Sequence, residues 1–337
     1  MARTGPLNSI CDVAGIRVGC AEDALAQTGV TAIVPENRAI CAVDVRGGGP
    51  GTRETDALAA ENLVDAVDAV VLSGGSVYGL AAADGVVAAM GAEGRGFALT
   101  ETPGAPRSPV VPAAILYDLA NGGNKAWGDA PPYAALGKRA YASRSTKVAL
   151  GSVGAGLGAQ AGALKGGQGS ASILTSDGFS VGALACVNCW GSPTMPGSRA
   201  FWAWPYEIDN EFGGVRPDAT THADAEDWRG AKFNTEPRAN TTIACLAVDA
   251  DLTPGEAKRV AQMASAGLAR AIRPVFAPFD GDVVFVLATA AKPAPAPRSL
   301  AIARLGAIAA DCLARAIARG VYAATATGAA PAWRDLT

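Results

Sequence analysis

Short apolar runs rich in β-branched residues alternate with alanine-rich stretches along the first part of the chain. The runs predict strands over residues 31–35, 39–45 and 69–72, and a shorter one over 146–150. The third run leads through Ser73-Gly74-Gly75-Ser76 into a segment that predicts a helix over 78–90. Strands that lead through glycine turns into helices are typical of proteins in which helices pack on sheets.

The middle of the chain changes from paired strands to a long polar segment. Residues 170–174 and 180–187 are strand-like and flank Ser176-Asp177-Gly178, which predicts an antiparallel hairpin. From Gly191 to Ala239 the sequence is irregular and rich in proline. A loop of this length inside a domain is usually functional or disordered, so we expect a processing linker over about residues 192–240.

A regular pattern returns with a strand that begins at Thr241. Thr253-Pro254-Gly255-Glu256 combines a capping Thr, a Pro suited to the first helical position and a Glu three residues on, and predicts a helix from Pro254 to about Ile272. Two strand-like segments, 274–279 and 283–288, flank Asp280-Gly281-Asp282, and an amphipathic helix is predicted over 299–319. Together these elements predict an α+β or layered α/β unit.

Composition is typical of a globular protein. The 337 residues are half hydrophobic and carry a formal net charge of −3, so nothing favours nucleic acid or an anionic membrane as a partner. No uncharged apolar run reaches the roughly 18 residues that span a bilayer. The first residues lack the apolar core of a secretory signal, so we expect a cytoplasmic protein.

The seven cysteines are odd in number and scattered, which favours buried thiols over a disulfide framework. Cys186 and Cys189 have the spacing of metal ligands. They lie in a strand-like run, however, where residues three apart point to opposite faces, and no second pair accompanies them. The sequence therefore predicts no metal site.

The junction Asn240-Thr241-Thr242 carries the strongest chemical hypothesis. The only histidine, His222, lies in a polar loop, which argues against a histidine-based triad. A Thr hydroxyl at the start of a strand could cut the peptide bond before it and expose its own α-amine as a base. Asn-Thr before a strand is by itself an ordinary turn, but here it ends the long linker.

Three other groups have both a structural and a functional interpretation. Asp280-Gly281-Asp282 is most simply a hairpin turn, but its two carboxylates could orient and charge-balance a nearby hydroxyl and ammonium group. Residues 47–52 and 73–76 do not fit a P-loop or a dinucleotide fingerprint, so we expect tight turns where backbone passes close to backbone or substrate. Lys165 is either a solvated loop lysine or a desolvated cation that lowers the pKa of a nearby amine.

At these residues the chain resembles the DmpA-type self-processing aminopeptidases, the family that includes the β-aminopeptidases and the nylon-oligomer hydrolases. The resemblance runs over most of the chain, through residues 45–48, 72–80 and 279–282. Thr after Asn at the junction is most similar to the nylon-oligomer hydrolase branch, whereas the D-aminopeptidase branch has Ser after Gly.

The resemblance implies a four-layer α/β/β/α sandwich, a fold related to that of ornithine acetyltransferases. It also implies a single domain that is cut into fragments 1–240 and 241–337. The fragments would stay together and assemble into a homo-oligomer, a tetramer of heterodimers.

The resemblance assigns catalytic roles to Thr241, Asn188, Asp280, Asp282 and Lys165. Thr241 would be the nucleophile, and Tyr117 matches a substrate-side tyrosine; the spacing of Lys165 differs between branches. The implied activity is hydrolysis of peptide or peptide-like amide bonds through an acyl-enzyme, without metal or organic cofactor. An acyltransferase of the ornithine acetyltransferase type and a non-catalytic binding protein on the same scaffold are the alternatives.

Overall fold

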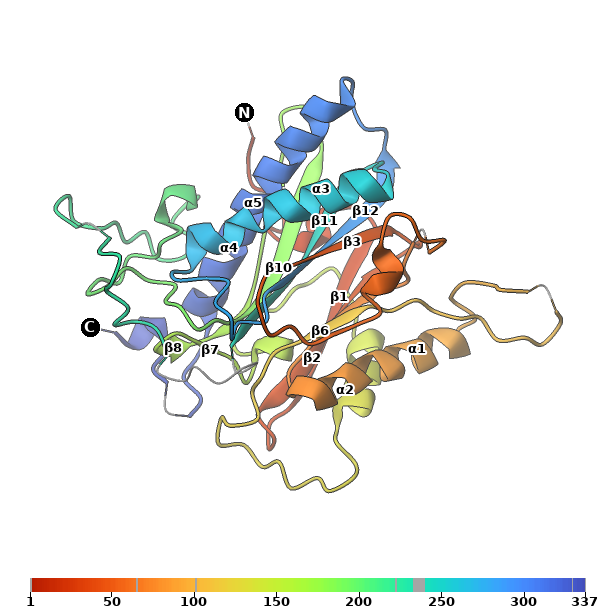
Figure 1. The fold of residues 1–337 in the computed structure, drawn as a ribbon, viewed down its shortest axis with the longest axis horizontal. Coiled ribbons are helices and arrows are strands. Elements are labelled where there is room, and N and C mark those ends of the chain that lie inside the picture. The colour runs from red at the N-terminus through yellow and green to blue at the C-terminus, as the bar shows by residue number, and fades with distance from the viewer. Residues whose placement is uncertain are drawn as a thin grey trace.

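Two five-stranded sheets lie face to face in the structure, a computed structural model that describes residues 2–64, 66–100, 102–221, 223–232, 240–328 and 330–336 (Figure 1). The strand order of the first sheet is β1 (Ile16–Asp23), β2 (Thr28–Pro35), β5 (Val70–Ser73), β6 (Ala113–Ile115), β4 (Thr52–Arg53). The order of the second is β3 (Ile40–Val45), β12 (Val283–Lys292), β11 (Thr241–Ala250), β10 (Ser180–Asn188), β9 (Gly167–Leu174). A separate ribbon pairs β7 (Gln160–Ala161) with β8 (Leu164–Lys165).

Helices cover the outer face of each sheet (Figure 1). On the first sheet lie α1 (Ala82–Ala92) and α2 (Tyr133–Ala142), and on the second lie α3 (Pro254–Ala264), α4 (Ala266–Ala271) and α5 (Arg298–Ala323). Short 3₁₀ turns occupy Ile10–Asp12, Asp56–Leu58, Ser76–Ala81, Gly154–Gly156, Trp204–Tyr206 and Trp333–Asp335. The chain is thus a four-layer α/β/β/α sandwich, as the resemblance implied.

Alternating side chains along the strands build the core between the layers. On β11, Ile243 and Cys245 pack between the two sheets, whereas Ala244 and Leu246 pack under the helices of the second sheet. A third apolar cluster joins the first sheet to α1 and α2. The central strand β11 is therefore buried on both faces, which explains the continuous apolar run over residues 243–248.

Several local predictions are confirmed. The strands expected at 31–35, 39–45 and 69–72 are β2, β3 and β5, and the expected hairpin is β9 and β10, paired antiparallel. The capping box forms, since the Thr253 hydroxyl accepts the Glu256 N–H at 3.3 Å and a Glu256 carboxylate oxygen accepts the Thr253 N–H at 2.8 Å. The last helix, expected to end near residue 319, continues to Ala323 as α5.

The strand expected over residues 146–150 is wrong. Only Ser145 pairs with the first sheet, at Val18 on the edge strand β1. The chain then crosses to the second sheet, where Gly151 pairs with Gln168 in a left-handed conformation with φ +87°. Residues 146–150 lie between these two isolated pairings and form no strand.

The helix expected from Pro254 to Ile272 is divided at Ser265 into α3 and α4. The Ser265 hydroxyl donates hydrogen bonds to Asp44 at 2.6 Å and to the carbonyl oxygen of Ala261 at 3.1 Å. A serine that bonds back to the preceding turn competes with the helical ladder, and the bond to Asp44 holds its hydroxyl there, so the two contacts together account for the break.

The hairpin expected around Asp280-Gly281-Asp282 is also wrong. Residues 274–279 form a loop, and β12 pairs in parallel with β11 and antiparallel with β3. The tight turn lies before the motif, where the Asp280 N–H donates to the carbonyl oxygen of Ala277 at 2.9 Å. Parallel neighbours need a long crossover, which α3 and α4 supply here.

The linker runs between β10 and β11 on one side of the molecule (Figure 1). Its described part is irregular apart from the turn at Trp204–Tyr206, as predicted. His222 and residues 233–239 lie outside the described residues.

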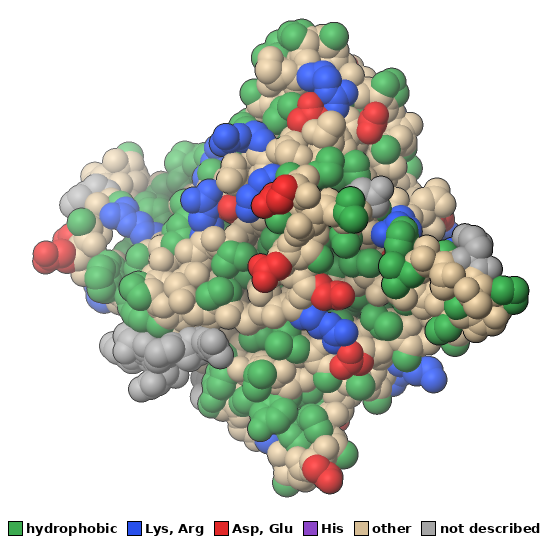
Figure 2. Space-filling view, turned by 45° about the vertical axis from the view of Figure 1, so that its right-hand side comes forward, with side chains coloured by type: hydrophobic (Ala, Val, Ile, Leu, Met, Phe, Trp, Pro, Cys, Tyr) green, Lys and Arg blue, Asp and Glu red, His purple; other side chains and the backbone are tan. Residues whose placement is uncertain are grey.

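On the face drawn in Figure 2, Lys and Arg side chains are interspersed with Asp and Glu side chains, in agreement with the net charge of −3. Within the described residues, none of the helices combines the length and the apolar character that crossing a bilayer requires.

Candidate active site

Thr241 and Asn188 are direct register partners, because β11 begins where its antiparallel neighbour β10 ends. Alternation places both side chains on the face that carries Cys186 and Ile243, toward the layer between the sheets. Each is only 2% exposed. The sheet thus brings together two residues that are 53 positions apart in the sequence (241 − 188).

Two donors from the described residues contact the carbonyl oxygen of Asn240. The Thr241 hydroxyl donates to it at 2.5 Å, and the backbone N–H of Gly281 donates to it at 2.8 Å. Gly281 reaches this position because Asp280 forms a parallel bridge with Asn240 just before β12 begins. A hydroxyl and a second donor therefore lie at the carbonyl of the bond that we expect to break.

The carboxylates of Asp280 and Asp282 are held by backbone N–H groups and are each 1% exposed. Asp282 accepts from Thr242 at 2.7 Å and from Phe276 at 3.3 Å, and Asp280 accepts from Ala277 at 2.9 Å. Burial raises the pKa of both carboxyls, and the charge of Asp280 raises the pKa of Asp282 further. The pair therefore resists carrying two negative charges at once.

The glycine-rich segment before β4 contacts the backbone of residues 280–282. The Gly49 N–H donates to the carbonyl oxygen of Asp280 at 2.7 Å, and the Gly47 N–H donates to that of Asp282 at 3.3 Å. A Cβ atom on Gly47 would lie 2.4 Å from the Asp280 carbonyl oxygen, so only glycine fits there. The prediction that backbone passes close to backbone at this segment is confirmed.

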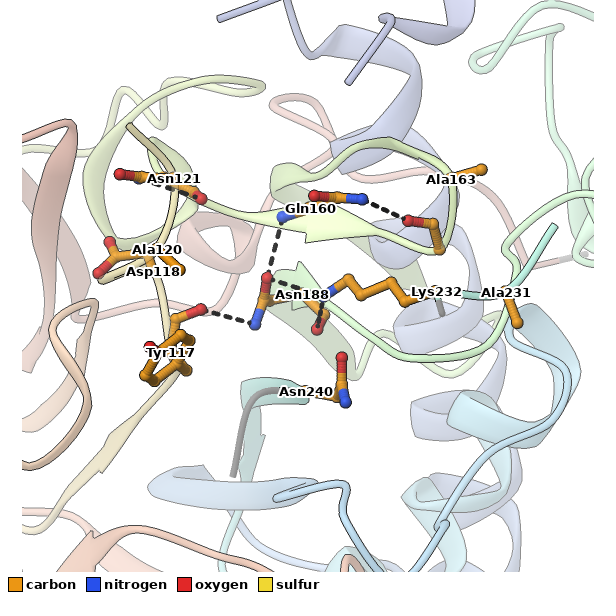
Figure 3. Close-up of a pocket in the computed structure, with 12 residues that line it drawn as sticks. Tyr117, Asp118, Ala120, Asn121, Gln160, Ala163, Asn188, Ala231, Lys232 and Asn240 are labelled. Atoms are coloured by element: carbon orange, nitrogen blue, oxygen red, sulfur yellow. Dashed lines mark hydrogen bonds between the residues drawn. The ribbon is translucent and has the colours of Figure 1, made fainter. Parts of the chain in front are cut away.

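The amide of Asn188 has a fixed orientation (Figure 3). Its nitrogen donates to the carbonyl oxygen of Tyr117 at 3.1 Å, and its oxygen accepts from the Gln160 N–H at 2.9 Å and from the Lys232 ammonium at 3.1 Å. Tyr117 thus touches Asn188 through its backbone, while the two residues line a common cavity.

That cavity has a volume of about 260 Å³ and opens beside the junction. Its wall includes Tyr117, Asp118, Asn188, Lys232 and Asn240 (Figure 3). Asn240, not Thr241, contributes to the wall, so the cavity reaches the Asn240–Thr241 bond from the Asn240 side.

The model of peptidase family S58 matches residues 8–332 of the chain. The chain is 43% identical over 350 residues to an uncharacterized aminopeptidase of Mycobacterium bovis, with 98% of each chain covered. It is 40% identical over 352 residues to one of Mycobacterium leprae, with 97% of this chain and 94% of the relative covered. The chain belongs to peptidase family S58.

Solved structures share the fold of this S58 chain. A Burkholderia sp. β-aminopeptidase superposes with a TM-score of 0.71 at 24% identity, over 98% of this chain and 91% of that one. An L-aminopeptidase D-Ala-esterase/amidase from Ochrobactrum anthropi, described as a variant of the Ntn-hydrolase fold, gives 0.69 at 22% identity, over 96% and 88%. These comparisons confirm the family and the fold that the sequence motifs indicated.

Lys165 lies at the end of the β7–β8 ribbon and lines a cavity next to the first one. Its ammonium donates to the carbonyl oxygens of Ala159 and Gly166, both at 2.8 Å, and of Gly156 at 3.4 Å. Burial lowers its pKa to about 8, against the charge of Asp118, which raises it. Lys165 is therefore desolvated, and its catalytic role stays a prediction.

Lys232 was missed at the sequence level. Its ammonium donates to the main-chain oxygen of Asn188 at 2.9 Å and to the side-chain oxygen at 3.1 Å. Burial lowers its pKa to about 8, against the charge of Asp280, which raises it. The available signal was its position, because Lys232 is the only lysine between Gly191 and Asn240.

Cys186 and Cys189 pack on opposite faces of the second sheet, as their spacing in a strand predicts. Cys186 lies in the core between the sheets, and Cys189 lies in the core under the helices. Two thiols on opposite faces cannot bind one metal ion together.

Proposed function

We propose that this S58 peptidase is made as a precursor that cuts its own Asn240–Thr241 bond and then works as an N-terminal-nucleophile hydrolase of amide bonds. The fragments would contain 240 and 97 residues (337 − 240 = 97). The observation that carries the proposal is the contact of both the Thr241 hydroxyl and the Gly281 N–H with the carbonyl oxygen of Asn240. Membership of a peptidase family and relatives named aminopeptidases support it.

In the cleavage step the Thr241 hydroxyl oxygen attacks the carbonyl carbon of Asn240. The Gly281 N–H stabilises the negative charge that develops on the carbonyl oxygen. The C–N bond then breaks, an ester joins Asn240 to the Thr241 oxygen, and the hydroxyl proton ends on the nitrogen of Thr241. Water hydrolyses the ester, which gives a carboxylate on Asn240 and a free amine on Thr241.

In turnover the new α-amine, with a reference pKa of about 7.7–8.0, takes the proton of the Thr241 hydroxyl. The attacked carbonyl would occupy the place that the Asn240 carbonyl has in the precursor. Gly281 and the Asn188 amide would then serve as oxyanion donors; losing one such donor typically raises the barrier by about 2.7–4 kcal/mol. Asp280 and Asp282 would balance the charge of the α-ammonium.

The proposed substrates are small peptides or peptide-like amides that enter the cavity beside Tyr117 and Asn188. The size of the cavity, about 260 Å³, suits a short segment rather than a folded protein. The names of the Burkholderia and Ochrobactrum proteins, both aminopeptidases, favour substrates with a free amino terminus. A tetramer of heterodimers is the proposed assembly.

Intact mass spectrometry of freshly purified protein tests the proposal directly. We expect two species that correspond to residues up to 240 and from 241, and native mass gives the assembly. An amide panel of L-, D- and β-peptides and linear polyamide oligomers then ranks the substrates. Added amino acids that capture the acyl group would indicate an acyltransferase, and an active protein that remains one chain would refute the proposal.

A further inference from the structure

The segment that precedes the junction is docked into the candidate site up to Lys232. The Lys232 N–H donates to the carbonyl oxygen of Trp190 at 2.9 Å, and the Ala163 N–H donates to that of Gly230 at 2.9 Å. Trp228 packs edge to face on Trp190, with ring centroids 5.4 Å apart. These contacts place the lysine at a defined point nine residues before Thr241 (241 − 232).

The ammonium of Lys232 is held by Asn188 and interacts electrostatically with the buried carboxylate of Asp280. It makes charge-assisted hydrogen bonds to both Asn188 oxygens, at 2.9 and 3.1 Å (Figure 3). Its charge also lowers the pKa of Asp280. Since the Asn188 oxygen is held by Lys232 and Gln160, the amide nitrogen is turned toward Tyr117, to whose carbonyl oxygen it donates.

In the uncleaved chain the buried carboxylates lack a positive charge that the mature enzyme would supply. Asp280 and Asp282 are buried next to the junction, and in the precursor the Thr241 nitrogen is a neutral amide. The α-ammonium that would balance them forms only when the bond breaks. A buried carboxylate without a cation is costly, so before cleavage a positive charge near Asp280 stabilises its ionised form.

We propose that Lys232 is a positioning residue of the precursor, whose ammonium orients Asn188 and balances the charge of Asp280 until the α-ammonium of Thr241 replaces it. This inference rests on the proposed self-cleavage. The linker would therefore contribute to its own cleavage, because Lys232 belongs to the segment that ends at Asn240. Lys232 does not touch the reacting atoms in this role and is not their base.

The pH dependence of self-cleavage separates this role from that of a base. The ionisable groups that face Lys232 or line its cavity are Cys189, Asp280, Asp118 and Tyr117, and Asp282 interacts electrostatically with Asp280. A counter-ion is effective while protonated, so cleavage should slow as the pH rises above about 8, the lowered pKa of Lys232. A base would give the opposite slope. Arginine keeps its charge throughout this range, so Lys232→Arg should remove the decline of the cleavage rate at alkaline pH.

Pulse-labelled full-length chain from cell-free synthesis, chased into buffers from about pH 6 to 10, measures the cleavage rate on gels. We expect Lys232→Met to slow cleavage at least about tenfold, equivalent to about 1.4 kcal/mol of barrier, because Asn188 and Asp280 lose a charged partner. Lys232→Arg should cleave near the wild-type rate without its alkaline decline. For Lys232→Ala, added methylammonium chloride should restore cleavage, whereas equal sodium chloride should not.

Wild-type cleavage by Lys232→Met would overturn the inference, as would a failure of both Arg and methylammonium to restore the rate. A rate that rises through pH 8 in the wild type and is lost in Lys232→Arg would identify a base instead. Thr241→Ala keeps the two proposals apart. Cleavage at the junction in that variant refutes the proposed function itself, whatever the Lys232 variants do.

Discussion

The backbone N–H of Gly281 donates to the carbonyl oxygen of Asn240, with 2.8 Å between nitrogen and oxygen. This contact depends on the parallel pairing of β11 and β12, which aligns Asn240 with the residues before β12. In the proposed enzyme the same donor would serve twice, first at the carbonyl of the chain itself and then at the carbonyl of each substrate. The geometry of self-cleavage and that of turnover would therefore be tested by the same substitutions.

Gly281→Ala should slow self-cleavage strongly. A Cβ atom at this position would lie 2.6 Å from the Thr241 hydroxyl oxygen and 2.9 Å from the carbonyl oxygen of Gly49, so the hydroxyl must turn away from Asn240. We expect at least a tenfold lower rate in the pulse-chase assay, equivalent to about 1.4 kcal/mol of barrier. Gly255→Ala is the matched control, because a Cβ atom there meets nothing within 4 Å. Equal rates for both variants would contradict the assignment.

Thr241→Ala should remain a single chain of 337 residues and lack amidase activity, whereas Thr241→Ser should still be cut. The reason is that alanine removes the attacking oxygen and serine keeps it. Thr242→Val is the control, since the Thr242 hydroxyl has no hydrogen-bond partner among the described residues and its removal leaves the junction backbone intact. Intact mass distinguishes the three variants. A precursor band that persists in Thr242→Val would show that the assay reports folding rather than chemistry.

The sequence predicts the layers of this fold better than their connections. Strands such as β2 and β5, the β9–β10 hairpin and the capped start of α3 follow from local patterns of apolar residues, turns and caps. The break at Ser265 does not, because it depends on a hydrogen bond to Asp44, which is 221 residues away. The pairing of β11 with β12 is likewise non-local, so an Asp-Gly sequence that normally marks a hairpin was misassigned.

Some residues of the candidate site can be predicted from the sequence, and others only from the structure. Thr241, Asp280 and Asp282 stand out through the linker and the Asp-Gly-Asp motif, and Asn188 and Tyr117 through family resemblance. That Asn188 is the register partner of Thr241 requires the β10–β11 pairing across a long loop. Lys232 has no motif, and only its docked position reveals it.

Lys165→Met tests the predicted catalytic lysine against its structural contacts. Loss of the ammonium leaves the buried carbonyls of Ala159 and Gly166 without this donor, so the free energy of unfolding should fall by about 1–3 kcal/mol. A catalytic role requires in addition that cleaved, folded Lys165→Met loses turnover. Denaturant unfolding and the amidase assay measure the two effects. Lys138→Met, on the exposed face of α2, should change neither. Full turnover in Lys165→Met would leave only the structural role.

Asp282→Asn should flatten the pH dependence of stability, measured in the uncut Thr241→Ala background. Burial and Asp280 raise the pKa of Asp282 above the unfolded value of about 3.9, so folding favours its protonated form. The stabilisation is complete below the unfolded pKa and is lost as the pH rises through the folded pKa, at up to about 1.4 kcal/mol per pH unit. Asparagine stays neutral, so its free energy of unfolding should fall less between pH 5 and pH 8. Asp129→Asn, an exposed control, should keep the slope of the parent; the same slope in Asp282→Asn would refute a raised pKa at this carboxyl.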